Sequence, residues 1–226
     1  MKKNIFVALD FNSLDRAIDV CKKIKDQIAG VKIGTELYAI CGPAGIKKLR
    51  DEVGLDIFLD LKLGPEIPNQ VRKTVAAIES LKIIKYLTIH LSGDYEMLKA
   101  AQETAGSIEL LGVTILTSQS DLQNIGIKNS VEEQVKLLVN LAIKSKISGV
   151  IASAQDFKII RSLSKNLKIF CPGIRGEEDK KNDQKRIMSY KDFSKIVDDK
   201  CFAVIGRPII EGDPVQNIKK IIQSSK

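Results

Sequence analysis

Charged residues stand at or near the ends of three apolar segments in the first third of the chain. The run Phe-Leu-Asp-Leu-Lys places Asp60 and Lys62 on the same face of an expected strand, because strand side chains alternate between faces. Two earlier runs repeat this design, with Asp10 after one apolar run and Lys32 between two β-branched residues of the other. Each charge alone could simply mark the entry of a strand into a loop. Three successive cases favour a site where fixed carboxylates and ammonium groups act on a substrate, because buried ion pairs add little stability by themselves.

The elements that would position these charges alternate along the chain. Apolar residues recur at helical spacing in 14–25 and 131–144, where Ser13 and Ser130 are the expected N-caps. Short apolar runs between such segments indicate βα units, right-handed crossovers and a parallel sheet. Eight units predict a closed (β/α)8 TIM barrel, with a doubly wound open sheet as the alternative. The expected strands are Ile5–Leu9, Val31–Gly34, Ile57–Lys62, Tyr86–Leu91, Leu110–Leu116, Gly149–Ala152, Lys168–Cys171 and Phe202–Gly206.

Active sites of such barrels lie at the C-terminal ends of the strands, and most of the unusual polar residues fall there. His90 is the only histidine of the chain, and a lone histidine in a strand is more typical of a hydrogen-bonded core residue than of a general base. The polar residues at or just after expected strand ends are Asp10, Lys32, Asp60, Lys62, His90, Thr117, Ser118, Arg175 and Arg207.

The last two expected strands end in sequences suited to a phosphate group. Gly206 lets the backbone approach an anion and Arg207 offers a planar guanidinium, at the place where barrels often bind phosphate. A glycine turn with a surface arginine is the simpler alternative. The polar stretch from about 174 to 187 lacks apolar periodicity and is a predicted lid, with Pro172 and Gly173 as its hinge.

Length and composition bound the remaining possibilities. We expect residues 1–226 to form a single barrel domain, because no linker-like segment interrupts them, although two small domains would also fit this length. The formal net charge of +8 comes mostly from lysines spread along expected helices, as on a solvated surface that could also attract an anionic substrate. No basic run is interleaved with aromatic residues, so nucleic-acid binding is not expected.

The cysteines argue against a metal centre and against secretion. The four cysteines form no CxxC pair and only one histidine accompanies them, so no metal site is expected. Cys171 and Cys201 lie in strand-like runs and are expected core residues. The chain shows no signal peptide and no apolar stretch of about 18 residues, which predicts a cytoplasmic protein without membrane segments.

Taken together, the motifs resemble those of the orotidine 5′-phosphate decarboxylase family. The resemblance covers nearly the whole chain and rests on the order and spacing of the motifs, since each is weak alone. They are Ala8-Leu9-Asp10, Val31-Lys32-Ile33-Gly34, Asp60-Leu61-Lys62, Ile67-Pro68-Asn69, Leu116-Thr117-Ser118, Pro172-Gly173-Ile174-Arg175, Asp183-Gln184-Lys185-Arg186 and Val204-Ile205-Gly206-Arg207-Pro208.

The resemblance implies a lyase without cofactor or metal. It would convert orotidine 5′-monophosphate to uridine 5′-monophosphate (UMP) and carbon dioxide in de novo pyrimidine synthesis, as a homodimer with shared active sites. Lys62 would protonate C6 of the pyrimidine, and Asp60 would lie beside the substrate carboxylate. Lys32 would belong to the same catalytic network of charges. The other expected substrate contacts are Asp10 and Lys32 at the ribose, Thr117 and Ser118 at the pyrimidine, Arg175, Gln184, Gly206 and Arg207 at the phosphate, and Ile67 and Pro172.

One segment departs from the family pattern. Gly64–Gln70 is one residue longer than usual, with Glu66 in place of an aspartate and Gln70 in place of a threonine. In the family those two residues reach into the site of the partner subunit. Glu66 is therefore a predicted catalytic residue, although it could instead be an acid that favours the first turn of a helix after Pro65.

Three other functions remain open at this point. A related sugar-phosphate decarboxylase or aldolase barrel would need a divalent metal. A non-enzyme with a degraded site at Gly64–Gln70 would bind UMP without turnover. A general anion or nucleic-acid binder, the third alternative, would show steep salt dependence and no nucleotide selectivity.

Overall fold

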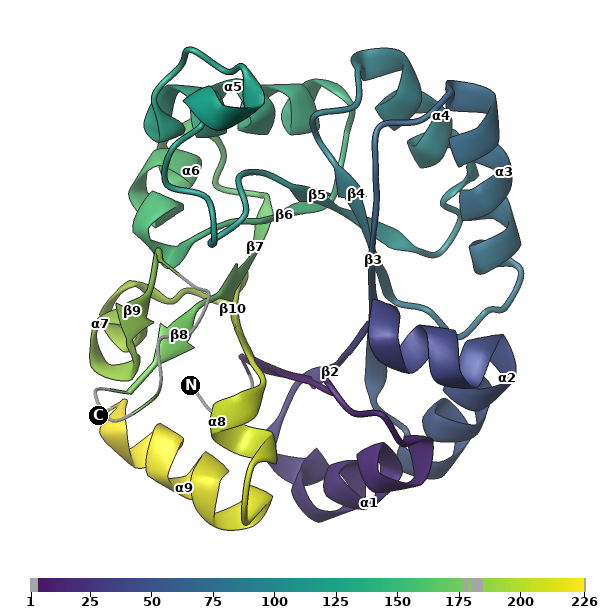
Figure 1. Ribbon diagram of the computed structural model, residues 1–226, viewed down its shortest axis with the longest axis vertical. Coiled ribbons are helices and arrows are strands. Elements are labelled where there is room, and N and C mark those ends of the chain that lie inside the picture. Colours follow the sequence, from purple (N-terminus) through teal and green to yellow (C-terminus); the bar gives the residue numbers. More distant parts are fainter. Residues whose placement is uncertain (1–3, 177–178, 180–184, 226) are drawn as a thin grey trace.

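Eight parallel strands close into a barrel in the computed structural model, which describes residues 4–176, 179 and 185–225 (Figure 1). Around the barrel the order is β1, β10, β7, β6, β5, β4, β3 and β2, and β1 pairs with both β10 and β2. The predicted (β/α)8 barrel is thus confirmed, and the open sheet was the wrong alternative. The strands are β1 (Ile5–Ala8), β2 (Gly30–Gly34), β3 (Asp56–Leu63), β4 (Tyr86–His90), β5 (Glu109–Val113), β6 (Gly149–Ile151), β7 (Lys168–Pro172) and β10 (Cys201–Ile205).

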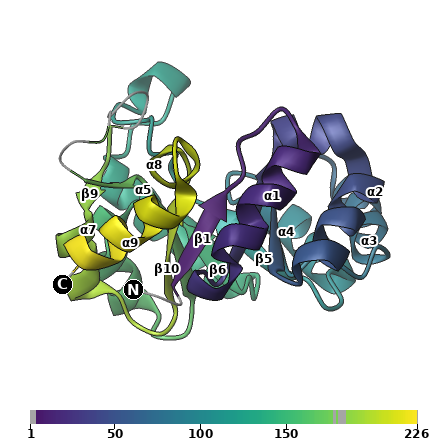
Figure 2. The same cartoon turned by 90° about the horizontal axis from the view of Figure 1, so that it is seen from below.

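Helices cover the outside of the barrel, and two of them begin at the predicted caps. The Ser13 hydroxyl accepts a hydrogen bond from the Arg16 amide, and Ser130 forms a reciprocal capping box with Glu133. Figure 2 shows α1 and α9 on either side of β1. The helices are α1 (Leu14–Ile24), α2 (Thr35–Val53), α3 (Pro68–Glu79), α4 (Tyr95–Thr104), α5 (Val131–Lys144), α6 (Phe157–Leu163), α7 (Tyr190–Ile196), α8 (Arg207–Ile210) and α9 (Pro214–Ser224). None of the helices among the described residues is long and apolar enough to cross a membrane.

Aromatic side chains fill the inside of the barrel below the strand ends. Phe6, Phe58, Tyr86 and Phe170 pack edge-on or tilted, with ring centroids 5.0–6.5 Å apart. Gly30 makes room for this cluster, because a Cβ there would lie 2.4 Å from Cε1 of Phe6. Burying each such ring stabilises the fold by ~1.5–3 kcal/mol. This cluster forms a core inside the barrel, separate from the larger core between the strands and the helices.

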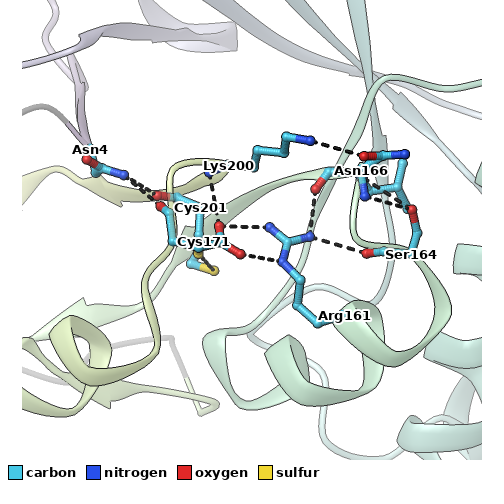
Figure 3. Close-up of polar contacts among 9 residues, drawn as sticks. Asn4, Arg161, Ser164, Asn166, Cys171, Lys200 and Cys201 are labelled. Carbon is cyan, nitrogen blue, oxygen red and sulfur yellow. Dashed lines mark hydrogen bonds and ion pairs between the residues drawn. The ribbon is translucent and has the colours of Figure 1, made fainter.

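Hydrogen bonds and an ion pair connect segments at the N-terminal end of the barrel strands (Figure 3). The Arg161 guanidinium binds both carboxylate oxygens of Asp198, at 2.6 and 3.0 Å. The Asn4 amide donates to the carbonyls of Asp198 and Cys201, which joins the entry of β1 to the entry of β10. Cys171 and Cys201 are fully buried free thiols with Sγ atoms 3.9 Å apart, as expected of core residues. The contacts of Asn4 and Arg161 stabilise the fold at the end remote from the strand C-termini.

The connection after β7 differs from the structureless loop that its sequence suggests. Two short strands, β8 (Ile174–Arg175) and β9 (Met188–Ser189), pair in parallel near its two ends. The Met188 amide also donates to the Gly173 carbonyl at 3.0 Å. Backbone amides and carbonyls near the barrel need hydrogen-bond partners, and the pairing of β8 with β9 supplies them. The sequence of this connection has no apolar periodicity that would predict a strand. The lid over 174–187 stays a prediction, because 177–178 and 180–184 lie outside the described residues.

Candidate active site

Four side chains of alternating charge form a row across the ends of β1, β2 and β3. The Lys32 ammonium lies 3.2 Å from Oδ1 of Asp10 and 3.6 Å from Oδ2 of Asp60. The Lys62 ammonium binds the same Oδ2 of Asp60 at 2.8 Å. These strands are neighbours in the barrel, so the alternation along each one carries its charged residue to a common edge. The convergence expected from the sequence is therefore present.

Burial is uneven along this charged row. The side chain of Asp60 is 8% exposed and lies between the two lysines, whereas the side chain of Lys62 is 39% exposed. Interactions between charges strengthen where water is excluded. The row thus offers an accessible ammonium held beside a buried carboxylate, an arrangement that suits the stabilisation of a negative charge developing on a ligand.

The backbone at Lys62 departs from a regular strand. Its φ of 48° lies in the left-handed region, which costs a non-glycine residue ~1–2 kcal/mol. The pairing of β3 with β4 shifts register between Leu59 and Leu63, which marks a bulge around this lysine. The sequence alternation placed Lys62 on the correct side of the strand but gave no sign of the bulge.

Thr88 holds this bulge and was missed by sequence reasoning. Its side chain is fully buried. The hydroxyl accepts a hydrogen bond from the backbone amide of Lys62 at 2.8 Å and donates one to Oδ1 of Asp60 at 3.0 Å. The signal that could have found it was its place two residues before His90, on the same inward face of β4. A polar residue on the inner face of a barrel strand indicates a partner there.

A cavity of about 290 Å³ opens beside the charged row. Its volume is close to the lower end of the range for small-molecule sites. Val113, Ile115, Ile151 and Val204 supply apolar walls. The cavity brings together ten residues predicted from the sequence: Asp10, Lys32, Asp60, Lys62, Thr117, Ser118, Pro172, Arg175, Gly206 and Arg207.

The candidate phosphate end lies where β10 passes into α8. Gly206 precedes α8, and a Cβ at this glycine would lie 3.2 Å from Oδ2 of Asp10 and 3.3 Å from Cβ of Ala8. Arg207 begins the helix, and Arg175, only 8% exposed, lines the same cavity from β8. Both arginines line the cavity on the side of the last strands, where barrels often bind phosphate, and a guanidinium group suits such an anion.

Two predicted site residues do not line this cavity, and the position of a third falls outside the described part of the chain. Glu66 is exposed, and its carboxylate accepts the amide of Ile67 at 2.7 Å. Ile67 is 68% exposed just before α3. Gln184 lies outside the described residues. The structure therefore does not bring Glu66 to the cavity of its own chain.

His90 lies half-buried at the end of β4, near the charged row. Burial lowers the pKa of its imidazole below the usual 6.5, and the Lys62 ammonium lowers it further, while Asp60 opposes the change. The imidazole is thus held in its neutral form near neutral pH, and its structural role stays a prediction.

We expect His90 to make the protein less stable in mild acid. Because its pKa is lower in the folded state, the unfolded chain binds more protons once the pH falls below about 6.5. The free energy of unfolding should decrease as the pH drops through the folded-state pKa, and His90→Gln should remove this contribution. Urea unfolding at several pH values from 7.5 to 5 measures it in both proteins. Equal pH dependence in the two would contradict the prediction.

No group of three or more His, Cys, Asp and Glu side chains suited to a metal ion occurs in the part of the chain that the structure describes. Independence of metal stays a prediction, because it concerns the reaction rather than the geometry. The donor atoms near the cavity are instead arranged as alternating charges and as two arginines, which suits an organic anion bearing a phosphate.

Comparison with known proteins places this geometry in a family. The model of the orotidine 5′-phosphate decarboxylase / HUMPS family matches residues 3–221. The chain belongs to this family. Relatives within the decarboxylase family include the orotidine 5′-phosphate decarboxylase of Ehrlichia chaffeensis, 40% identical over 97% of this chain and 96% of that protein. The protein of the same name from Wolbachia pipientis is 38% identical, with 97% of each chain covered.

Solved structures of the decarboxylase family share the fold. The crystal structure of orotidine 5′-phosphate decarboxylase from Lactobacillus acidophilus superposes with a TM-score of 0.81 and is 29% identical, with 98% of each chain covered. The corresponding structure from Pyrococcus horikoshii gives a TM-score of 0.78 at 25% identity, again covering 98% of both chains. The resemblance read from the sequence motifs is thereby confirmed.

Proposed function

We propose that this chain decarboxylates orotidine 5′-monophosphate to UMP and carbon dioxide, the last step of de novo pyrimidine nucleotide synthesis. The observation that carries the proposal is the Lys62 ammonium, held 2.8 Å from the buried Asp60 carboxylate at the edge of a cavity of about 290 Å³. Relatives named for this activity, at up to 40% identity over nearly the full length, support it over a metal-dependent sugar-phosphate barrel.

The reaction needs a stabiliser for negative charge at C6 of the pyrimidine. When the bond between C6 and the carboxylate carbon breaks, carbon dioxide leaves and the electron pair stays on C6. The Lys62 ammonium stabilises that charge and then transfers one proton from Nζ to C6, which yields UMP. Asp60 keeps a negative charge beside the departing carboxylate and fixes the ammonium. A preorganised charge of this kind is usually the largest catalytic contribution.

The remaining cavity residues would bind the parts of the substrate that do not react. Binding energy from the phosphate can order the site around the distant C6 atom. We extend the proposal to 174–187, which would close as a lid over the phosphate within a single-domain barrel. The proposed contacts are Asp10 and Lys32 at the ribose, Thr117 and Ser118 at the pyrimidine, and Arg175, Gln184, Gly206 and Arg207 at the phosphate, with Ile67 and Pro172 as further contacts.

We also propose a homodimer in which Glu66 completes the site of the partner subunit. Glu66 lies outside the cavity of its own chain, beside the exposed Ile67. Ile40 in helix α2 is 52% exposed as well. Burying each of these isoleucines against a second copy would contribute ~1.5–3 kcal/mol. A cytoplasmic location is part of the proposal, supported by four free cysteines, since disulfides are rare in reducing compartments.

The test is the loss of orotidine 5′-monophosphate absorbance with purified protein in excess EDTA. We expect turnover that chelator does not affect. Turnover that needs an added divalent metal would favour the sugar-phosphate class instead. UMP binding without any turnover would contradict the enzymatic proposal and point to Gly64–Gln70 as the defect.

A further inference from the structure

The hydroxyl of Thr88 joins the two central charges of the candidate site. It accepts the backbone amide of Lys62 at 2.8 Å and donates to Oδ1 of Asp60 at 3.0 Å. A hydroxyl carries one proton and two lone pairs, so one orientation satisfies both bonds. Thr88 is fully buried, and water has no access to replace either contact. A single side-chain group therefore fixes the main chain of the lysine and the carboxylate that binds its ammonium.

The position of Thr88 in the sheet explains why a side-chain hydroxyl, rather than a backbone carbonyl, accepts the hydrogen bond of the Lys62 amide. Leu59 pairs with Leu87 and Leu63 pairs with Ile89, so β3 advances four residues while β4 advances two. Thr88 is the single β4 residue opposite the resulting bulge. At a bulge the regular ladder is interrupted and backbone groups lose their partners. The Thr88 hydroxyl supplies the acceptor that the Lys62 amide would otherwise lack.

The contact also fixes the plane of the Asp60 carboxylate, with one oxygen at Thr88 and the other at the lysines. Oδ1 is occupied by Thr88, whereas Oδ2 lies 2.8 Å from Nζ of Lys62 and 3.6 Å from Nζ of Lys32. Rotation of the carboxylate would break its bond to Thr88. The hydroxyl therefore holds the carboxylate plane and the left-handed backbone of Lys62 together.

We propose that Thr88 is a positioning residue for decarboxylation, acting through Lys62 and Asp60 without touching the substrate. This inference rests on the proposed function. Valine has the shape of threonine without the hydroxyl, so Thr88→Val would leave a buried amide and a carboxylate oxygen each without a partner. Thr88→Ser would keep the hydroxyl and lose only a methyl group.

The experiment compares kcat, KM and UMP affinity in wild type, Thr88→Val and Thr88→Ser. The matched control is Thr114→Val, since Thr114 is also buried and its hydroxyl donates only to the Ile151 carbonyl, at 2.9 Å. A displacement of ~1 Å at a reacting group can lower the rate ~100-fold. We therefore expect kcat to fall ~10–100-fold in Thr88→Val with little change in UMP affinity. Thr88→Ser should restore most of the rate, and Thr114→Val should resemble wild type.

Wild-type kcat in Thr88→Val would overturn the inference, and so would equal losses in Thr88→Val and Thr114→Val. The proposed function is tested separately by the wild-type protein in the same assay, because an inactive wild type contradicts that function alone. In that case the rate of hydrogen exchange at the Lys62 amide still tests whether Thr88 positions Lys62. Faster exchange in Thr88→Val than in Thr88→Ser supports the positioning role, and equal protection contradicts it.

Discussion

Replacing Lys62 with methionine is expected to lower kcat by ~1,000-fold or more, because a preorganised donor is lost where negative charge develops. Methionine retains most of the length of the side chain without the ammonium. UMP should still bind, since Arg175 and Arg207 are unchanged at the other end of the cavity. The protein should remain folded, because Asp60 keeps its contacts with Lys32 and Thr88. Steady-state decarboxylation and UMP titration measure the two effects.

Lys82→Met is the matched control for this substitution. Lys82 also has a left-handed backbone, with φ of 56°, but its side chain is exposed and pairs with Glu79 away from the cavity. Both variants lose an ammonium at a left-handed position, and only one loses it beside Asp60. Similar kcat values in Lys62→Met and Lys82→Met would rule out Lys62 as the proton donor.

Mixing two inactive variants is expected to restore activity if Glu66 acts in the partner's site. Lys62→Met and Glu66→Gln each disable both sites of their own homodimers. After subunit exchange, about half of the dimers are mixed, and each mixed dimer contains one site with an intact Lys62 and an intact Glu66. About a quarter of wild-type activity should therefore return at equal mixing in a two-fold symmetric dimer. The rate after mixing, relative to the unmixed variants, measures this recovery.

The control pair for this experiment is Lys62→Met with Lys32→Met. Both lysines line the cavity of their own chain, so every site of a mixed dimer contains one lesion and no activity should return. If Lys62→Met with Glu66→Gln also stayed inactive despite verified exchange, Glu66 would act within its own chain or not at all. Full activity of Glu66→Gln alone would exclude a catalytic role for this residue.

The barrel and the convergence of Asp10, Lys32 and Asp60 were predictable because they depend on local patterns. The alternation of side chains along a strand decides which face each one occupies, and the C-terminal ends of neighbouring parallel strands lie at the same end of the barrel. The left-handed Lys62 was not predictable in this way. It depends on a hydrogen bond to Thr88, 26 residues away, and a two-residue period contains no information about such a partner. The bulge follows from tertiary structure alone.

Glu66 marks a different limit of sequence reasoning. Its spacing after Lys62 is altered, and whether its carboxylate reaches a substrate depends on a surface between two molecules rather than on the pattern of one chain. The short strands β8 and β9 are a third case, because two-residue pairings leave no periodic signal. Pattern thus predicts which residues approach the strand ends, and tertiary contacts decide how each is held.

The pairing of β1 with β10 has a consequence for how the protein is made. Ile5 lies opposite Ala203 and Val7 opposite Ile205. Strand β1 therefore cannot complete its pairing, and the barrel cannot close, until β10 has been synthesised. Such distant pairings slow folding. The nascent chain carries all four charges long before Gly206 and Arg207 are synthesised. A chain arrested ahead of β10 would hold these four charges together with Arg175, but it would lack Gly206 and Arg207 of the proposed phosphate end.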